Sequence, residues 1–192
     1  MPNYCENHIT ISGDKSKFID KLVKEFRNED GSPFGHVIPP NDNDTALDRT
    51  ETWGCKWEPD VYDVNYEEKD DQFYLYVACQ TPWSPPTGIL NKLFQMGYIV
   101  SCQYIEFGNS FVGEFDNGND YHGNICWKDD DEMEQYYDGD IELSIDDFID
   151  RAKFNGTWYV TNPKTKEIMD GLMDEIMELH LSRNPSQTVS CT

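Results

Sequence analysis

Basic residues are scarce in this chain. Its 192 residues include 15 Lys and Arg against 37 Asp and Glu, so the formal net charge is −22. Because such an excess of carboxylates repels phosphate, direct binding to DNA or RNA is disfavoured. Three uses of the charge stay open: it keeps the protein dissolved, it binds a metal, or it addresses a basic surface on a partner. A surface made for nucleic acid belongs to the third class, because spaced carboxylates can substitute for phosphates in a groove lined by Lys and Arg.

Long apolar runs and the usual signatures of enzymes are missing too. No run approaches the ~20 apolar residues of a membrane span, and the first residues, MPNYCENH, lack the basic and apolar stretches of a signal peptide. The chain has no Gly-rich phosphate loop, no G-x-S-x-G and no H-E-x-x-H motif, and its four histidines are scattered. We therefore expect a cytoplasmic protein that is not an enzyme and has no cofactor and no metal site. A metal-dependent enzyme that uses clustered carboxylates is kept as an alternative.

Cysteine pairs with the spacing of metal ligands are also lacking. The chain has six cysteines, and no two of them form a C-x-x-C pair. Three lie within expected strands, so we predict reduced, buried thiols. Hydrophobic residues make up 38% of the chain and aromatic residues 14%, which is enough for a packed core.

The residues from Phe73 to Gly97 carry the clearest structural signal. Apolar and polar side chains alternate from Phe73 to Gln80, which is the period of a strand. Prolines end this strand, Ser84 can cap a helix with Pro85 at its first position, and Gly97 ends that helix. We predict a strand that leads directly into a helix.

Similar patterns on either side complete an N-terminal domain over residues 1–116. Strands are expected at 4–12, 61–66, 73–80, 98–107 and 110–116, and helices at 15–29 and 85–97. The proline-rich residues 32–60 are expected to form a long connection. The first six elements have the order β-α-β-β-α-β, which is typical of a ferredoxin-like antiparallel sheet with two helices on one face. The predicted fold class is therefore α+β.

Residues 117–192 are predicted to form an acidic α/β C-terminal extension with two helices. Ser144 opens the first helix, and Asp147 three residues later completes a capping-box pattern. The sequence GTWYV at 156–160 is expected to form a strand. Pro163 begins the last helix, whose apolar face carries three methionines and either packs on the core or binds a partner or a second copy.

The residues expected to contact a partner come from this extension and from the long connection. In the extension, acids are interspersed with aromatic residues, which indicates an ordered segment. In the connection, two tryptophans flank a glycine; they either pin the loop across the sheet or present aromatic anchors to a partner. The candidate partner-binding residues are Asp129, Asp130, Asp131, Glu132, Glu134, Tyr136, Tyr137, Asp138, Asp140, Glu142, Trp53 and Trp57.

Four stretches of the first part of the chain carry a family resemblance. They are MPNYCENHITISG at the start, WGCKW, QTPWSPP and YIEFGNSFVG, in that order. Together they resemble a ferredoxin-like domain family of unknown function that is carried by tailed phages and conjugative plasmids. The resemblance covers about residues 1–116. It implies a fold and a mobile-element context, and it supplies no catalytic residues.

The charge, the acidic extension and this resemblance lead to one functional prediction. We expect a viral anti-defence protein that binds and inhibits a nucleic-acid-handling defence complex of the host, of the restriction or CRISPR type, through an acidic surface that mimics DNA. Its partner would be a host protein with a basic groove. The alternative is a structural or adaptor protein that binds a partner through the tryptophan loop, or forms a homodimer through the methionine-rich last helix.

Overall fold

One mixed α+β fold holds together residues 3–41 and 45–160, the part of the chain that the computed structural model describes. Its centre is a seven-stranded sheet with the order β2-β3-β1-β4-β5-β6-β7, in which every neighbouring pair is antiparallel. The strands are β1 (Tyr4–Asp14), β2 (Asp60–Lys69), β3 (Gln72–Pro82), β4 (Ile99–Glu106), β5 (Phe111–Asp116), β6 (Asn119–Asn124) and β7 (Tyr159–Val160). The described helices are α1 (Lys17–Phe26), α2 (Pro33–Val37), α3 (Ala46–Trp53), α4 (Thr87–Gln95), α5 (Asp130–Asp138) and α6 (Ile145–Phe154).

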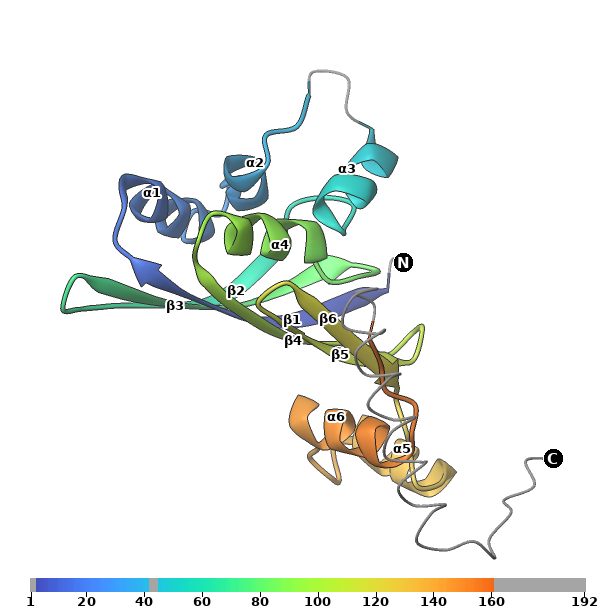
Figure 1. Cartoon of the computed structure of the whole chain (residues 1–192). Coiled ribbons are helices and arrows are strands. Elements are labelled where there is room, and N and C mark those ends of the chain that lie inside the picture. The colour runs from blue at the N-terminus through green and yellow to red at the C-terminus, as the bar shows by residue number, and fades with distance from the viewer. Residues whose placement is uncertain (1–2, 42–44, 161–192) are drawn as a thin grey trace, which may run out of the picture.

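The two faces of the sheet carry different helices. Figure 1 shows α1 to α4 on one side of the sheet, and α5 and α6 on the opposite side, near β5 and β6. Strand alternation explains the division: Ile9 and Ile11 of β1 point into the core under α1 and α4, whereas His8 and Thr10 point to the other face. Four helices thus cover the first face, and the expectation of two is corrected, because α2 and α3 lie within the long connection.

The alternating patterns of the N-terminal half predicted the strands well and the helix starts less well. The first helix begins later than expected, because β1 continues to Asp14 and the hydroxyl of Ser16 accepts the capping hydrogen bond from the Ile19 amide at 3.2 Å. Ser84 does not cap α4 either. Its hydroxyl donates instead to the Gly54 carbonyl at 2.5 Å, which ties the start of α4 to the end of α3.

The connection between α1 and β2 is packed and partly helical. Thr45 and Asp48 form a capping box at the start of α3. At its end, Gly54 has a φ of +89°, and a Cβ at this position would lie 2.6 Å from the Thr87 amide nitrogen. Trp53 is 1% exposed, and its indole Nε1 donates to the Ile38 carbonyl at 3.0 Å. The tryptophan therefore pins this connection to the core, as the first of the two interpretations proposed.

The sheet continues past residue 116. Asn117 and Gly118 both have positive φ and form the tight turn between β5 and β6, and the predicted domain boundary falls in this turn. A second apolar cluster lies under α6, where Phe148, Ile149 and Ala152 pack on the sheet. The division into two domains stays a prediction. The last helix, expected from Pro163, lies outside the described residues.

Four cysteines are buried and free, as expected, whereas the free Cys126 is only half-buried and Cys191 lies outside the described residues. Cys5, Cys55, Cys79 and Cys102 lie in the core within the described residues. Burial raises the pKa of the Cys55 thiol to about 12, and burial likewise raises the pKa of Cys79. Thiols of this kind are inert, because the thiolate is the reactive form.

Candidate partner-binding surface

The acidic run after β6 forms helix α5. Asp129 caps it: its carboxylate accepts a hydrogen bond from the Glu132 amide at 2.8 Å. Acids at the first turn of a helix are favoured because they face the positive end of the helix dipole. Gly139, with a φ of +81°, ends the helix. The acidic composition and the helical fold of this segment are therefore compatible.

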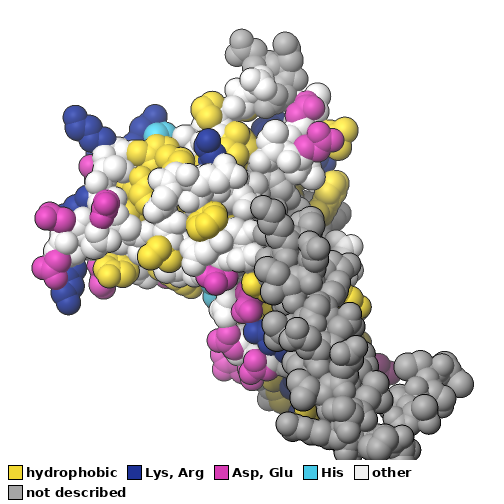
Figure 2. All heavy atoms as spheres, in the orientation of Figure 1, with side chains coloured by type: hydrophobic (Ala, Val, Ile, Leu, Met, Phe, Trp, Pro, Cys, Tyr) yellow, Lys and Arg dark blue, Asp and Glu magenta, His cyan; other side chains and the backbone are white. Residues whose placement is uncertain are grey.

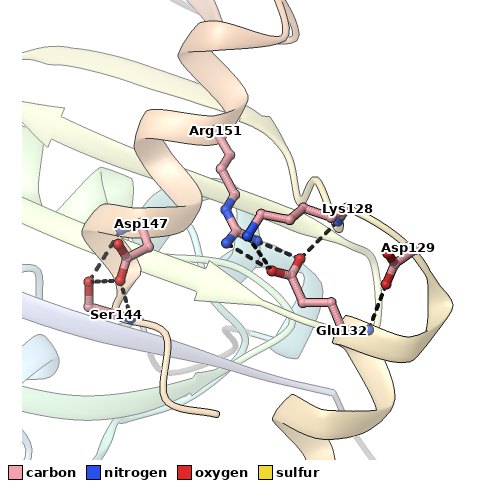
Figure 3. A network of polar contacts seen from close by, with 6 residues as sticks. All are labelled: Lys128, Asp129, Glu132, Ser144, Asp147 and Arg151. Atoms are coloured by element: carbon pink, nitrogen blue, oxygen red, sulfur yellow. Dashed lines mark hydrogen bonds and ion pairs between the residues drawn. The ribbon is translucent and has the colours of Figure 1, made fainter.

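Glu132 ties α5 to α6. Its side chain is 10% exposed and accepts two hydrogen bonds from the Arg151 guanidinium, at 2.8 and 3.1 Å (Figure 3). Lys128 adds a backbone hydrogen bond at 2.8 Å and an ion pair at 3.2 Å. The backbone amide of Lys128, followed by the Arg151 guanidinium, lowers the pKa of Glu132 to about 2. Glu132 is thus an internal structural group, and its carboxylate is not offered to a partner.

The two tyrosines of α5 have different environments. Tyr136 is half-buried, with ring centroids 5.3 Å from Trp127, 5.5 Å from Phe107 and 5.6 Å from Phe148. Tyr137 is 59% exposed. Tyr136 therefore belongs to the packing between α5, α6 and the β4–β5 turn, while Tyr137 is the tyrosine that a partner can reach.

The remaining carboxylates of this region form an uncompensated surface, which we call the acidic surface. Residues 117–160 include twelve Asp and Glu but only three Lys and Arg. All three cations are engaged internally, because Lys128 and Arg151 pair with Glu132, and Lys153 pairs with Glu114 at 3.0 Å. Figure 2 shows acidic side chains gathered below the sheet. The acidic surface consists of the exposed carboxylates between residues 130 and 142, which form no hydrogen bond or ion pair within the described residues: Asp130, Asp131, Glu134, Asp138, Asp140 and Glu142.

A separate aromatic feature lies on the connection before β2. Trp57 is 37% exposed and Trp83 46% exposed, and Lys56 Nζ lies between them, 5.3 and 4.4 Å from the two ring centroids. Trp83 has a φ of +69°, a conformation that strains a residue with a bulky side chain. Of the two tryptophans expected to contact a partner, only Trp57 is accessible. Trp83 is not among the residues that the sequence predicts to contact a partner. It lies between Pro82 and the pair Pro85-Pro86, and these prolines indicate a constrained turn.

One cavity combines residue types that nucleophilic enzymes use. It has a volume of about 310 Å³ and is lined by Ser84, Asp120 and His122, among others. The Ser84 hydroxyl donates to the Gly54 carbonyl, however, and Asp120 accepts a hydrogen bond from the Tyr104 hydroxyl at 2.6 Å. The serine proton is thus directed at a backbone carbonyl and away from any base, so this cavity supplies no argument for a hydrolase.

Comparisons with known proteins identify no relative. No family model matches the chain, and neither the curated proteins nor the solved structures contain a significant match. Within residues 3–41 and 45–160, no cluster of three or more His, Cys, Asp or Glu has the arrangement of a metal site. None of the helices in that part of the chain has both the length and the apolarity needed to cross a membrane. The resemblance of residues 1–116 to a mobile-element family stays an expectation from the sequence.

Proposed function

We propose that this chain is a binding protein whose acidic surface occupies a basic, nucleic-acid-binding groove of a partner protein. The observation that carries the proposal is the charge distribution around α5. Six exposed carboxylates have no partner within the described residues, while the three nearby cations are engaged in internal ion pairs. Such an arrangement presents negative charge outward, as the phosphates of a nucleic acid do.

The attachment of α5 to the sheet supports a specific role for this charge. The helix is joined to α6 by the Glu132–Arg151 pair and to the apolar cluster by Tyr136. Carboxylates on an ordered helix lose little conformational freedom on binding, whereas those of a flexible tail lose more. The field of the surface also accelerates encounter with a basic partner at low salt.

We further propose that residues 1–116 form a ferredoxin-like domain and that the partner is a host defence complex. The order β2-β3-β1-β4, with α1 following β1 and α4 following β3, supports the fold. The similarity of four sequence stretches to a phage and plasmid family supports the context. The chain then acts in the host cytoplasm as an anti-defence inhibitor of a restriction or CRISPR complex, without catalysis.

An adaptor role is the second candidate, and the exposed tryptophans favour it. Trp57 and Trp83 are partly exposed on either side of Lys56, and exposed aromatic side chains are common binding anchors. In that case, replacing Trp57 and Trp83 by alanine abolishes partner binding, and neutralising the acidic surface does not.

Competition with DNA tests the proposal. Purified restriction and CRISPR effector complexes are mixed with fluorescent DNA, and the chain is titrated in while anisotropy is recorded. The test variant carries Asp130→Asn, Asp131→Asn and Glu134→Gln. The matched control carries Glu67→Gln, Asp70→Asn and Asp71→Asn, which remove the same charge from the exposed β2–β3 hairpin.

The proposal predicts that wild type and the hairpin control displace DNA from at least one complex equally well. The α5 variant should need at least about tenfold more protein, since each lost interfacial charge contact is worth about 1 kcal/mol or more. Its thermal melt should lie close to that of the wild type, because these three side chains make no hydrogen bond or ion pair within the described residues and only the helix-dipole contribution of Asp130 and Asp131 is lost. Equal displacement by the two variants would show that net charge alone is responsible and would contradict the proposal.

A further inference from the structure

A groove lies on the open face of the sheet, beside the segment that leads into α6. It consists of two adjoining cavities of about 350 and 400 Å³, which share His8 and Gln103. These two residues are paired across β1 and β4. Because His8 alternates with the core residue Ile9, the groove opens on the face opposite α1 to α4.

The first cavity combines an apolar floor with an acidic rim. Ile105, Phe107 and Phe148 supply apolar surface, and Glu6, Glu142 and Asp146 supply carboxylates. A neutral apolar ligand would leave the three carboxylates without a partner of opposite charge. A ligand that joins an apolar stem to a positive end satisfies both parts of the lining. Arginine has this form, and its guanidinium can serve several carboxylate oxygens at once.

The three carboxylates retain the capacity to bind. Glu142 makes no hydrogen bond or ion pair within the described residues. The Glu6 Oε1 atom accepts from the Tyr62 hydroxyl at 2.9 Å and lies 3.5 Å from His8 Nε2, which leaves its second oxygen available. Asp146 accepts through Oδ1 from the side chain of Gln103, and its Oδ2 makes no such bond. Each carboxylate thus has an oxygen for an incoming cation.

The second cavity extends the groove along β1. Tyr76 and Thr10 line it together with two further carboxylates, Glu114 and Asp116. Along β1, Glu6, His8 and Thr10 follow one another on one face, with steps of about 6.6 Å. The side chains on one side of an extended peptide repeat at the same distance. A peptide lying along β1 can therefore direct alternate side chains into both cavities.

We propose that this groove binds an extended, arginine-containing segment of a protein partner, with one arginine side chain in the first cavity. The inference rests on the proposed function, because it adds a second contact with the same kind of basic partner. Five carboxylates line the two cavities, and only Glu114 among them is paired with a Lys or Arg, Lys153; the remaining negative charge selects a cationic segment. A single-stranded nucleic acid stacking on Tyr76 would bring its phosphates against these carboxylates, which disfavours it.

Peptide binding to the full chain tests the groove separately from the acidic surface. The probe is a fluorescein-labelled octapeptide with arginine at alternate positions and serine between them, measured by anisotropy at 150 mM salt. A second peptide carries citrulline, a neutral analogue of similar shape, at each arginine position. A poly-deoxythymidine oligonucleotide of similar length probes nucleic-acid binding.

Two variants of equal design separate the sites. The groove variant carries Glu6→Gln and Asp146→Asn, which lie outside the acidic surface, and the α5 variant carries Asp130→Asn and Asp131→Asn. The proposal predicts binding of the arginine peptide that is at least about tenfold weaker in the groove variant and within threefold of wild type in the α5 variant. The citrulline peptide and the oligonucleotide should bind at least about tenfold more weakly than the arginine peptide.

Three results would overturn the inference: no binding of the arginine peptide, equal binding of the citrulline peptide, or equal weakening by the two variants. Preferential binding of the oligonucleotide would overturn it too. Because the DNA-competition assay uses α5 variants and this assay uses groove variants, each proposal can fail alone. The groove variant must keep the wild-type thermal melt; the single substitution Glu6→Gln repeats the test if it does not.

Discussion

Replacing Glu132 by glutamine removes the charge that joins α5 to α6. Arg151 donates two hydrogen bonds to this carboxylate, and Lys128 contributes an ion pair and a backbone hydrogen bond. The substitution keeps the size of the side chain and removes its charge. It leaves the half-buried Arg151 guanidinium without its ionic partner, and the contact between α5 and α6 loses its main polar link.

The pKa of Glu132 sets the magnitude of the effect. The Lys128 amide and the Arg151 guanidinium lower this pKa from 4.5 to about 2. Since one pKa unit corresponds to about 1.4 kcal/mol, the ionised side chain stabilises the folded state by roughly 3 kcal/mol at neutral pH at most. The network lies at the edge of the molecule, so we expect Glu132→Gln to lower the free energy of unfolding by about 2–3 kcal/mol. The melting temperature should fall by roughly 5–10 °C.

The lowered pKa of Glu132 also predicts how the stability difference between wild type and variant changes with pH. A carboxyl whose pKa is lower in the folded state stabilises fully above its unfolded pKa, and this stabilisation is lost as the pH falls through the folded pKa. Urea unfolding should therefore show the full difference between wild type and variant above about pH 4.5. The difference should shrink as the pH approaches about 2, where about half of the Glu132 side chains are protonated in the folded wild type as well.

Glu134→Gln provides the control, because Glu134 is exposed on the same helix and makes no hydrogen bond or ion pair within the described residues. Its unfolding free energy should stay within about 0.5 kcal/mol of wild type. Equal stability of the Glu132→Gln and wild-type proteins at pH 7 would refute the reasoning. A difference that persists unchanged at pH 2 would do so as well, because the loss would then not come from the charge.

Two further predictions concern the fold. Trp53→Ala should lower the free energy of unfolding, measured by chemical denaturation, by about 3–5 kcal/mol, because the side chain is 1% exposed and holds the connection to the core. A loss below about 1 kcal/mol would contradict this core role. Ser144→Ala should lower the free energy of unfolding by about 1 kcal/mol and increase amide hydrogen exchange in the first turn of α6, because the Ser144 hydroxyl accepts a hydrogen bond from the Asp147 amide at 3.2 Å. Unchanged exchange would contradict the capping role.

The N-terminal strands were predictable because one of their faces is buried. Alternation of apolar residues identifies β1 and β3, whose inward side chains form the core. Strand β6 differs in this respect. The sequence of β6, NDYHGN, has almost no apolar alternation, so its place in the sheet depends on backbone pairing with β5. The Asn117-Gly118 pair before it is a strong hairpin signal that would have found it.

Helices α3 and α5 were not predicted, because their sequences contain capping residues at the ends but no apolar face. Helix α3 begins with the capping pair Thr45 and Asp48, and α5 begins with Asp129 and ends at Gly139. Both segments are polar, so no apolar stripe indicated a helix. In the sequence, Pro33 belongs to a proline-rich run that favours irregular chain, whereas in the structure it begins α2, and proline is favoured in the first turn of a helix.

The functional surface was predictable in composition but not in detail. The acidic residues of the extension could be selected from the sequence, but the pairing of Glu132 with Arg151, 19 positions away, depends on how α5 and α6 pack. The groove brings Glu6 of β1 together with Glu142 and Asp146, which no local pattern connects. Side chains that meet only through sheet topology leave no periodic signal in the sequence.

The most direct test of the central claim is to identify what lies against α5 in the bound state. Gln135 is exposed on this helix, between the carboxylates of the acidic surface, and can be replaced by a photo-crosslinking amino acid without removing a charge. The same replacement at the exposed Asn65 of β2 is the control. We predict crosslinks from position 135, and not from position 65, to a surface rich in Lys and Arg on a nucleic-acid-binding protein of the host, and their loss when saturating DNA is added. Crosslinks to a surface without basic residues, or crosslinks that persist in the presence of DNA, would contradict the account.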